Sequence, residues 1–427
     1  MIATVSRLVE LILDSQVLNA AQCDKLRDNL QDRCKEPYQL AKDLLRRGWL
    51  TDYQLELIIK GDGQDLLLGP FIVLEPLGEG CMGQVFKARR RENGQLVALK
   101  MVHRDRRGDL RALHRFRREV EALAQLSHPN IITACDVSEI GIAHYYAMEY
   151  VEGINLERVI AANGPLPLGA ACDYVRQAAL GLQHAHERGL IHRDIKPGNL
   201  LVARPESDLK KTLGPGMSPE ARARFNRWGI VKILDLGLVR LENQDSFEGN
   251  GQMKLTQEGF SLGTVDYMAP EQIHDPHKVD IRADLYSLGC TFYEALVGQP
   301  PFPEGSLLEK LQGHKSRTPP PVNQLRPDVP EAAAEVVARL LAKQPEDRYQ
   351  EPGQVAGALA GVLVRMDRPL LGWDWRPQEQ SVKVRRAAET REQVIHPPPS
   401  ESDRLHWLLL AGILALLFSF LVALLAR

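Results

Sequence analysis

The residues best suited to chemistry lie in one short stretch, residues 192–201, with the sequence HRDIKPGNLL. Within six residues it places a carboxylate (Asp194), an ammonium (Lys196) and an amide (Asn199). The Pro-Gly pair between them disfavours a regular helix, so the three groups can converge instead of spiralling apart. The apolar residues at its end predict a short buried strand. A polar loop fixed on such a strand suits phosphoryl transfer, in which catalysis is mainly positioning and charge neutralisation.

A glycine-rich segment, residues 77–85 (LGEGCMGQV), follows the β-type apolar residues 71–74. The spacing G-x-G-x-x-G also occurs in dinucleotide-binding turns, but there it opens a helix. Here Val85 and Phe86 continue as a strand. The segment therefore predicts a hairpin whose tip can lay backbone N–H groups over phosphates.

Two further strands bring charged residues into apolar surroundings. Residues 97–100 read VALK, and the buried Lys100 needs a partner because an unpaired charge is costly to bury. Its predicted partner is Glu119, on a segment with apolar residues at helical spacing. Taken alone, Glu119 would be interpreted as a solvated surface charge. The VALK strand favours an ion pair between Glu119 and Lys100. Residues 231–237 (VKILDLG) form the second strand, which ends at Asp235.

These motifs, in this order, resemble the serine/threonine protein kinases, in particular the bacterial transmembrane kinases of the eukaryotic-like (Hanks) type. The loop matches H-R-D-x-K-P-x-N, and residues 263–271 (GTVDYMAPE) match the A-P-E element. The resemblance covers residues 71–365. It implies an α+β, bilobal kinase fold with a small β-rich N-lobe and a larger helical C-lobe.

The resemblance also implies a role for each site residue. Asp194 would accept the proton of the substrate hydroxyl, Lys196 would neutralise charge on the transferred group, and Lys100, paired with Glu119, would hold the ATP phosphates. Asn199 and Asp235 would bind Mg²⁺, with Mn²⁺ as an alternative. Asp284 would hold the backbone of the His192–Arg193 turn, and Glu271 would pair with Arg348. The implied ATP-binding residues are Leu77, Gly78, Glu79, Gly80, Cys81, Met82, Gly83, Gln84, Val85, Ala98, Lys100, Met148, Glu149, Val151, Asn155 and Leu201.

The chain departs from the family pattern in three places. Leu236 replaces the usual Phe after Asp235, and Cys81 occupies the glycine-rich tip. Residues 203–229 form an insertion with six basic and three acidic residues, for a net charge of +3. It is either a tolerated surface insertion or a functional one.

Thr256 and Ser261 are the predicted activation-segment phosphorylation sites.

Residues 1–66 predict an N-terminal helical module with a faint internal repeat. Asn19 and Thr51 occupy equivalent positions as predicted N-caps, and Gln22 and Gln54 follow each by three residues. The pattern indicates two helix-turn-helix units. The module either stabilises the kinase domain or serves docking or regulation.

The C-terminal part predicts a linker, residues 366–404, and a transmembrane helix, residues 405–426. These 22 residues carry no charged side chain, and at about 1.5 Å each they span about 33 Å, enough for a hydrocarbon core of about 30 Å. Basic residues before the span favour a cytoplasmic kinase domain on a C-terminal tail anchor in the inner membrane. Small residues recur every four positions from Ala411 to Ala423 and would allow two helices to pack closely in a homodimer. The alternative is chance, since a segment this rich in Leu and Ala often shows such spacing.

Composition limits the remaining possibilities. A net charge of −2 gives no global field for nucleic acid, and six scattered cysteines suggest reduced thiols and no disulfide framework. The sequence therefore predicts a non-specific serine/threonine protein kinase, a signalling enzyme that acts on protein substrates and itself. The alternative is a nucleotide-binding pseudokinase scaffold, which usually lacks one of the three groups retained here at positions 100, 194 and 235.

Overall fold

The computed structural model describes residues 4–27, 34, 36–80, 83–102, 120, 123–140, 143–203, 228–235, 262–275 and 279–366. Residues 1–367 form one compact unit, which contains the N-terminal module and both lobes of the kinase fold. The second unit, residues 368–427, lies outside the described residues.

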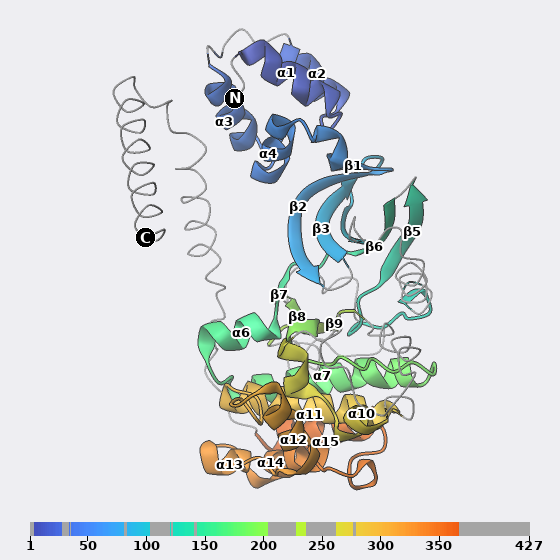
Figure 1. Ribbon diagram of the computed structural model, residues 1–427, viewed down its shortest axis with the longest axis vertical. Coiled ribbons are helices and arrows are strands. Elements are labelled where there is room, and N and C mark those ends of the chain that lie inside the picture. The colour runs from blue at the N-terminus through green and yellow to red at the C-terminus, as the bar shows by residue number, and fades with distance from the viewer. Residues whose placement is uncertain are drawn as a thin grey trace, which may run out of the picture. The chain divides into compact units, whose positions relative to one another are not determined.

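The N-lobe is a six-stranded antiparallel sheet with the order β1-β2-β3-β4-β6-β5 (Figure 1). Strands β2, β3 and β4 alternate between two faces, so every second residue of each strand points to the same side. One face carries a buried apolar cluster that includes Phe71, Ala88, Leu99 and Tyr145. The strands are β1 (Leu67–Leu68), β2 (Phe71–Gly80), β3 (Gly83–Arg90), β4 (Leu96–Val102), β5 (Ala134–Ile140) and β6 (Ala143–Glu149).

The C-lobe is mainly helical and carries a small three-stranded sheet with the order β7-β8-β9. Its core is built on α7 and α11, most of whose residues are buried. Helix α7 ends at His186, shortly before Gly189, whose positive φ of 72° is typical of the residue that follows a helix. The elements are β7 (Gly153–Asn155), α6 (Leu156–Asn163), α7 (Leu168–His186), β8 (Leu200–Ala203), β9 (Ile230–Ile233), α10 (Pro270–His274), α11 (Ile281–Val297), α12 (Leu307–Ser316), α13 (Val322–Leu325), α14 (Glu331–Leu340) and α15 (Pro352–Arg365).

The N-terminal module consists of α1 (Val5–Asp14), α2 (Ala20–Lys25), α3 (Pro37–Arg46) and α4 (Asp52–Lys60). Both predicted N-caps are confirmed. Asn19 with Gln22 and Thr51 with Gln54 each form a capping box, in which cap side chain and third-residue side chain exchange hydrogen bonds with the backbone. The repeat in the sequence is thus a repeat of helix starts.

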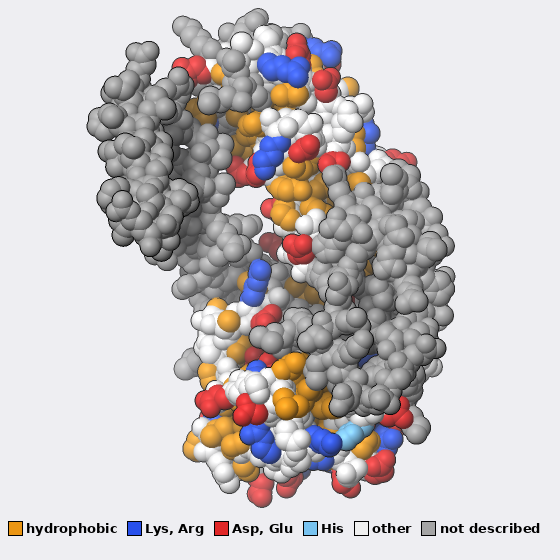
Figure 2. All heavy atoms as spheres, viewed as in Figure 1, with side chains coloured by type: hydrophobic (Ala, Val, Ile, Leu, Met, Phe, Trp, Pro, Cys, Tyr) orange, Lys and Arg blue, Asp and Glu red, His pale blue; other side chains and the backbone are white. Residues whose placement is uncertain are grey.

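The predicted bilobal kinase fold is confirmed for the described residues. Among them, no helix combines the length and apolar character that a membrane crossing needs, and the predicted span 405–426 lies outside them. The body of the insertion, residues 204–227, and the phosphorylation candidates Thr256 and Ser261 also lie outside. Over the described part of the surface in view, basic and acidic side chains are interspersed (Figure 2).

Candidate active site

The loop singled out in the sequence brings its three polar groups together. Lys196 Nζ lies 3.0 Å from Asp194 Oδ2, and Asn199 Nδ2 donates to the same oxygen over 3.2 Å. Asn199 Nδ2 also donates to the Asp194 carbonyl over 2.7 Å. The short 3₁₀ turn Pro197–Asn199 produces this convergence, because a helix would have placed Asn199 more than one turn beyond Asp194.

The backbone of Leu234 fixes this loop to the turn that carries Asp235. The Leu234 N–H donates to the Asn199 carbonyl over 2.8 Å, and its own carbonyl lies 2.8 Å from His192 Nε2. His192 Nδ1 accepts from the Asp194 N–H over 3.3 Å, so Nε2 carries the proton and donates to Leu234. Asn199 and Asp235, far apart in sequence, are thereby held side by side.

Asp284 holds the turn before the catalytic carboxylate, as the sequence predicts. Its two oxygens accept from the His192 N–H over 2.7 Å and from the Arg193 N–H over 2.6 Å. Arg193 has a φ of 65°, and Asp235 has a φ of 47°. Left-handed backbone in a non-glycine residue costs about 1–3 kcal/mol, and it persists where surrounding contacts enforce it. Arg193 directly precedes Asp194, and Asp235 is itself one of the predicted metal ligands.

Lys100 reaches from the N-lobe sheet to this turn. It is 6% exposed, and its Nζ lies 2.9 Å from Asp235 Oδ1. Burial by itself would raise the pKa of the Asp235 carboxyl, but the Lys100 ammonium, with His192 and Lys196, holds that pKa below its ordinary value. Asp235 is therefore anionic at neutral pH. The predicted partner Glu119 lies outside the described residues, so that ion pair stays a prediction.

Strand pairing places the predicted nucleotide-binding residues of the sheet on one face. Val85 lies opposite Lys100, and Ala98 lies opposite Met148. Because Ala98 and Lys100 are two residues apart in β4, these four side chains share a face. Leu77, on β2, is 40% exposed, so its apolar side chain is accessible to a ligand.

The glycine-rich segment is a hairpin, as predicted: Gly78 pairs with Val85, Glu79 with Gln84, and Gly80 with Gly83 across β2 and β3. A Cβ at Gly83 would lie 1.7 Å from the Met101 carbonyl oxygen, so a side chain there would push β3 off β4. Cys81 and Met82 at the tip lie outside the described residues.

The connection between the lobes shows which atoms are available to a ligand. The Glu149 side chain accepts from Lys232 Nζ over 2.7 Å and from the Thr133 N–H over 2.9 Å. The Glu149 N–H donates to the Thr133 carbonyl. A nucleotide contact from Glu149 would therefore use its carbonyl. Val151 is buried beside it.

Asn155 has a local role that the sequence analysis did not foresee. Its Oδ1 accepts from the Arg158 N–H over 2.9 Å and caps α6. Its backbone pairs with Leu201 across β7 and β8. The pairing brings Leu201 and Asn155, both predicted to contact the nucleotide, to one place below the sheet.

Two residues of the site were missed. Lys232 is 4% exposed and ties β9, the strand before Asp235, to Glu149. The signal was present, since Lys232 is a lone charge in an apolar strand, as Lys100 is. Gln272 Nε2 donates to the Arg193 carbonyl over 3.1 Å and links α10 to the catalytic turn. Nothing in the sequence marked Gln272.

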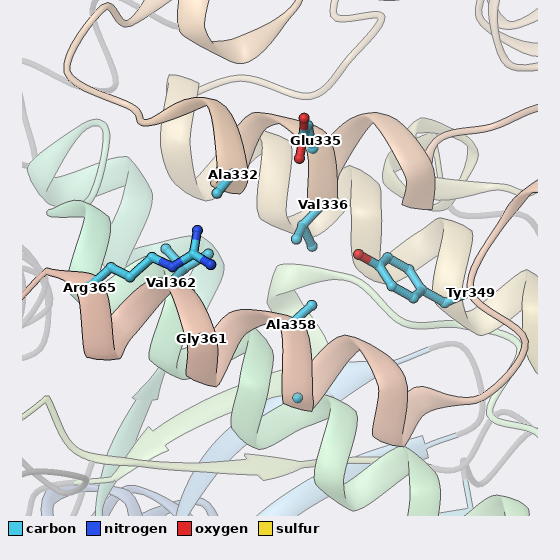
Figure 3. A pocket seen from close by; sticks show the side chains of 9 residues that line it. Ala332, Glu335, Val336, Tyr349, Ala358, Gly361, Val362 and Arg365 are labelled. Carbon is cyan, nitrogen blue, oxygen red and sulfur yellow. The ribbon is translucent and has the colours of Figure 1, made fainter.

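The residues present fit the predicted metal and nucleotide. Magnesium prefers hard oxygen ligands. The anionic Asp235 carboxylate would supply one. The Asn199 amide oxygen would supply another, because the amide nitrogen is hydrogen-bonded to Asp194. A cavity of about 310 Å³ lies elsewhere, between α14 and α15 (Figure 3). It is lined by small residues such as Gly357, Ala358 and Gly361, with Tyr349 beside them, and by none of the predicted site residues.

A glycine hairpin over a buried lysine, with that lysine set against an aspartate beside an H-R-D loop, defines the protein kinase class. The protein kinase domain family matches residues 71–356, more than half of the chain. The chain therefore belongs to the protein kinase family.

Several bacterial serine/threonine-protein kinases are similar to this chain. The chain is 34% identical over 306 residues to the serine/threonine-protein kinase Pkn1 of Myxococcus xanthus, which covers 71% of this chain and 40% of that protein. It is 31% identical over 300 residues to the serine/threonine-protein kinase PknE of Mycobacterium tuberculosis, covering 70% of this chain and 47% of that one. The chain thus spans less than half the length of these relatives. The solved PknI kinase domain of Mycobacterium tuberculosis is 26% identical, with a TM-score of 0.49, over 69% of this chain and 97% of that one.

Proposed function

We propose that this chain is a serine/threonine protein kinase that transfers the γ-phosphoryl group of ATP to Ser and Thr hydroxyls of proteins, including its own. The observation that carries the proposal is the pair of hydrogen bonds that the Leu234 backbone forms, one with His192 and one with Asn199. It sets the catalytic loop and the Asp235 turn in one rigid arrangement, which is what a reaction driven by positioning requires.

Each group has a defined task in this proposal. Asp194 orients the substrate hydroxyl and accepts its proton. Lys196, 3.0 Å away, neutralises charge that builds on the transferred phosphoryl group, and Lys100 holds the ATP phosphates. Mg²⁺ on Asp235 and Asn199 would supply charge neutralisation at the phosphates. All of these side chains are present, with Asp194 in contact with Lys196 and Asn199 and Asp235 in contact with Lys100. The arrangement therefore supports turnover over the alternative of a pseudokinase scaffold.

The function is tested by incubating the purified chain with radiolabelled ATP, Mg²⁺ and a mixed protein substrate. We expect phosphoserine and phosphothreonine after acid hydrolysis, and loss of label in Asp194→Asn, since an amide cannot accept the proton. Mass spectrometry of the labelled chain should find Thr256 or Ser261 modified. Labelling by Asp194→Asn at the wild-type rate would remove Asp194 from this role, and binding of ATP without any transfer would establish the scaffold.

We further propose that residues 405–426 anchor the chain in the cytoplasmic membrane, with the kinase domain in the cytoplasm. The uncharged span and the basic residues before it (Lys383, Arg385, Arg386, Arg391 and Arg404) support this. Ala411, Ala415, Ser419 and Ala423 would form a small-residue face for self-association, which would favour phosphorylation between two chains.

Membrane anchoring is tested by fractionating cells that express the full chain or a chain ending at residue 404. The full chain should pellet with membranes and resist alkaline carbonate, and the shortened chain should not. Replacing Ala415 and Ser419 with Leu keeps the span apolar but fills the groove, so self-association should fall while anchoring persists. Equal fractionation of the two chains would rule out the anchor, and unchanged self-association would rule out the dimer face.

A further inference from the structure

Helix α4 of the N-terminal module begins directly against strand β2, the strand that leads into the glycine-rich hairpin (Figure 1). The Thr51 hydroxyl donates to the Leu74 carbonyl. Gln54 Nε2 donates to the Val73 carbonyl over 2.7 Å. Gln54 is 2% exposed, so this is a buried amide committed to a strand 19 residues away in sequence.

The capping box orients both side chains toward the strand. The Thr51 N–H donates to Gln54 Oε1 over 3.0 Å, and the Gln54 N–H donates to Thr51 Oγ1 over 3.2 Å. With Oε1 held by the helix start, the Gln54 amide group presents its Nε2 to the sheet. Both hydroxyl and amide therefore serve the helix end and the strand at once, and neither can turn away without losing a cap bond.

The two carbonyls lie where the strand ladder is irregular. The pairing of β2 with β3 shifts register between Val73 and Glu75, and β1 pairs with β2 at Phe71 and Ile72. At such a bulge the extra residue is not served by the ladder, and the strand bends. Donors from α4 occupy this point. It lies three residues before Leu77, where the glycine-rich segment begins.

Apolar contacts extend the same attachment to the second strand of the hairpin. The rings of Tyr53 and Phe86 lie 6.1 Å apart. Phe86 and Val73 belong to one buried cluster with Leu55 and Ile58 of α4. Phe86 lies on β3 and Val73 on β2. The module therefore contacts both strands of the hairpin whose tip would cover the ATP phosphates. It shares a core with the lobe and is not an independent appendage.

We propose that helix α4 is a positioning element for nucleotide binding, in which Thr51 and Gln54 fix the bulge of β2 and so set the place of the hairpin over ATP. The inference rests on the proposed function for the identity of the nucleotide. It gives the module a role beyond stabilising the fold, because the residues that make the contact would control the affinity for ATP.

The test compares Gln54→Met with Gln22→Met in the full chain. Methionine keeps the length of the side chain but has no amide donor. Gln22 forms the same capping box with Asn19 at the start of α2, so it matches the local change without the sheet contact. We expect Gln54→Met to raise the KM for ATP about five- to tenfold, a change no larger than the free energy of one buried hydrogen bond allows, with kcat changed less than about twofold. Gln22→Met should change neither.

Three results separate the possible outcomes. An unchanged KM for ATP in Gln54→Met would overturn the inference, and so would a fall in kcat as large as the rise in KM. Either result would leave the module with a stabilising role only. If Gln54→Met does not fold, Thr51→Val and Thr51→Ser replace it: the valine variant should raise the KM, and the serine variant, which keeps the hydroxyl, should restore it. Backbone amide hydrogen exchange of residues 71–80 should be faster than in the wild type in Gln54→Met and Thr51→Val. It should be unchanged in Gln22→Met and Thr51→Ser.

Binding of a non-hydrolysable ATP analogue distinguishes this inference from the proposed function. A weaker analogue Kd in Gln54→Met than in Gln22→Met supports the positioning role whether or not phosphoryl transfer occurs. Equal analogue affinities count against it even in an active kinase. Failure of wild-type chain to transfer phosphate while it binds the analogue counts against the proposed function alone.

Discussion

Replacing Asp235 with Asn is expected to lower the rate of phosphoryl transfer by on the order of 10³-fold or more, because preorganised charge at the transferred group supplies much of the catalysis. Asp235 is held anionic by Lys100, whose Nζ lies 2.9 Å from Oδ1. The neutral amide would remove a negative ligand and weaken the contact with a lysine that is 6% exposed. The loss should appear mainly in kcat, measured at saturating ATP and Mg²⁺.

A matched control is Asp328→Asn, the same replacement at an ion pair with Arg326 where the Asp side chain is 64% exposed. That variant should keep its activity within about twofold, since exposed pairs contribute about 0–1 kcal/mol. Lys100→Met should match Asp235→Asn in activity, and both variants should remain folded at the assay temperature and unfold cooperatively. Transfer by Asp235→Asn at more than about a tenth of the wild-type rate would show that another group performs this task.

Breaking the ion pair between Glu271 and Arg348 is expected to cost about 3–5 kcal/mol of the free energy of unfolding, because one charge is then buried without its counter-charge. Arg348 is completely buried. Its Nη1 and Nη2 donate to the two Glu271 oxygens over 2.6 and 2.9 Å. Its other donors serve the carbonyls of Arg282, Ala342 and Lys343, so the guanidinium cannot move to water.

The variant Glu271→Gln keeps the shape of the side chain and removes its charge. Urea unfolding of this variant is compared with Glu346→Gln, which alters the exposed pair of Arg282 and Glu346, where the Glu side chain is 71% exposed. The control should lose less than about 1 kcal/mol. Activity of Glu271→Gln should fall as well, since the neighbouring Gln272 holds the Arg193 carbonyl. Equal losses of stability in the two variants would contradict the structural role of the pair.

Local chemistry made much of the site predictable. The loop around Asp194, the glycine hairpin and the caps at Asn19 and Thr51 are written in adjacent residues, where proline, glycine and capping side chains restrict the backbone directly. Lys100 was also predictable, because a lone charge in an apolar strand demands a partner. The pair of Asp284 with the His192–Arg193 backbone came from the family resemblance, and the structure confirms it.

The sequence by itself determined local features, because apolar period and turn residues act over a few positions. The fold class and the roles expected of the site residues came from the resemblance of its ordered motifs to the protein kinases. Tertiary structure alone decided which distant groups meet. Lys232 reaches Glu149 across 83 residues, Gln272 reaches Arg193 across 79, and Gln54 reaches the bulge of β2. The partner of a polar side chain cannot be predicted from the sequence alone. It depends on how helices and strands pack and on where a strand has a carbonyl that the sheet does not hydrogen-bond. In α4 the N-cap pattern of Thr51 and Gln54 could be recognised from the sequence. The hydrogen bonds of the same two side chains to β2 depend on how α4 packs against the sheet.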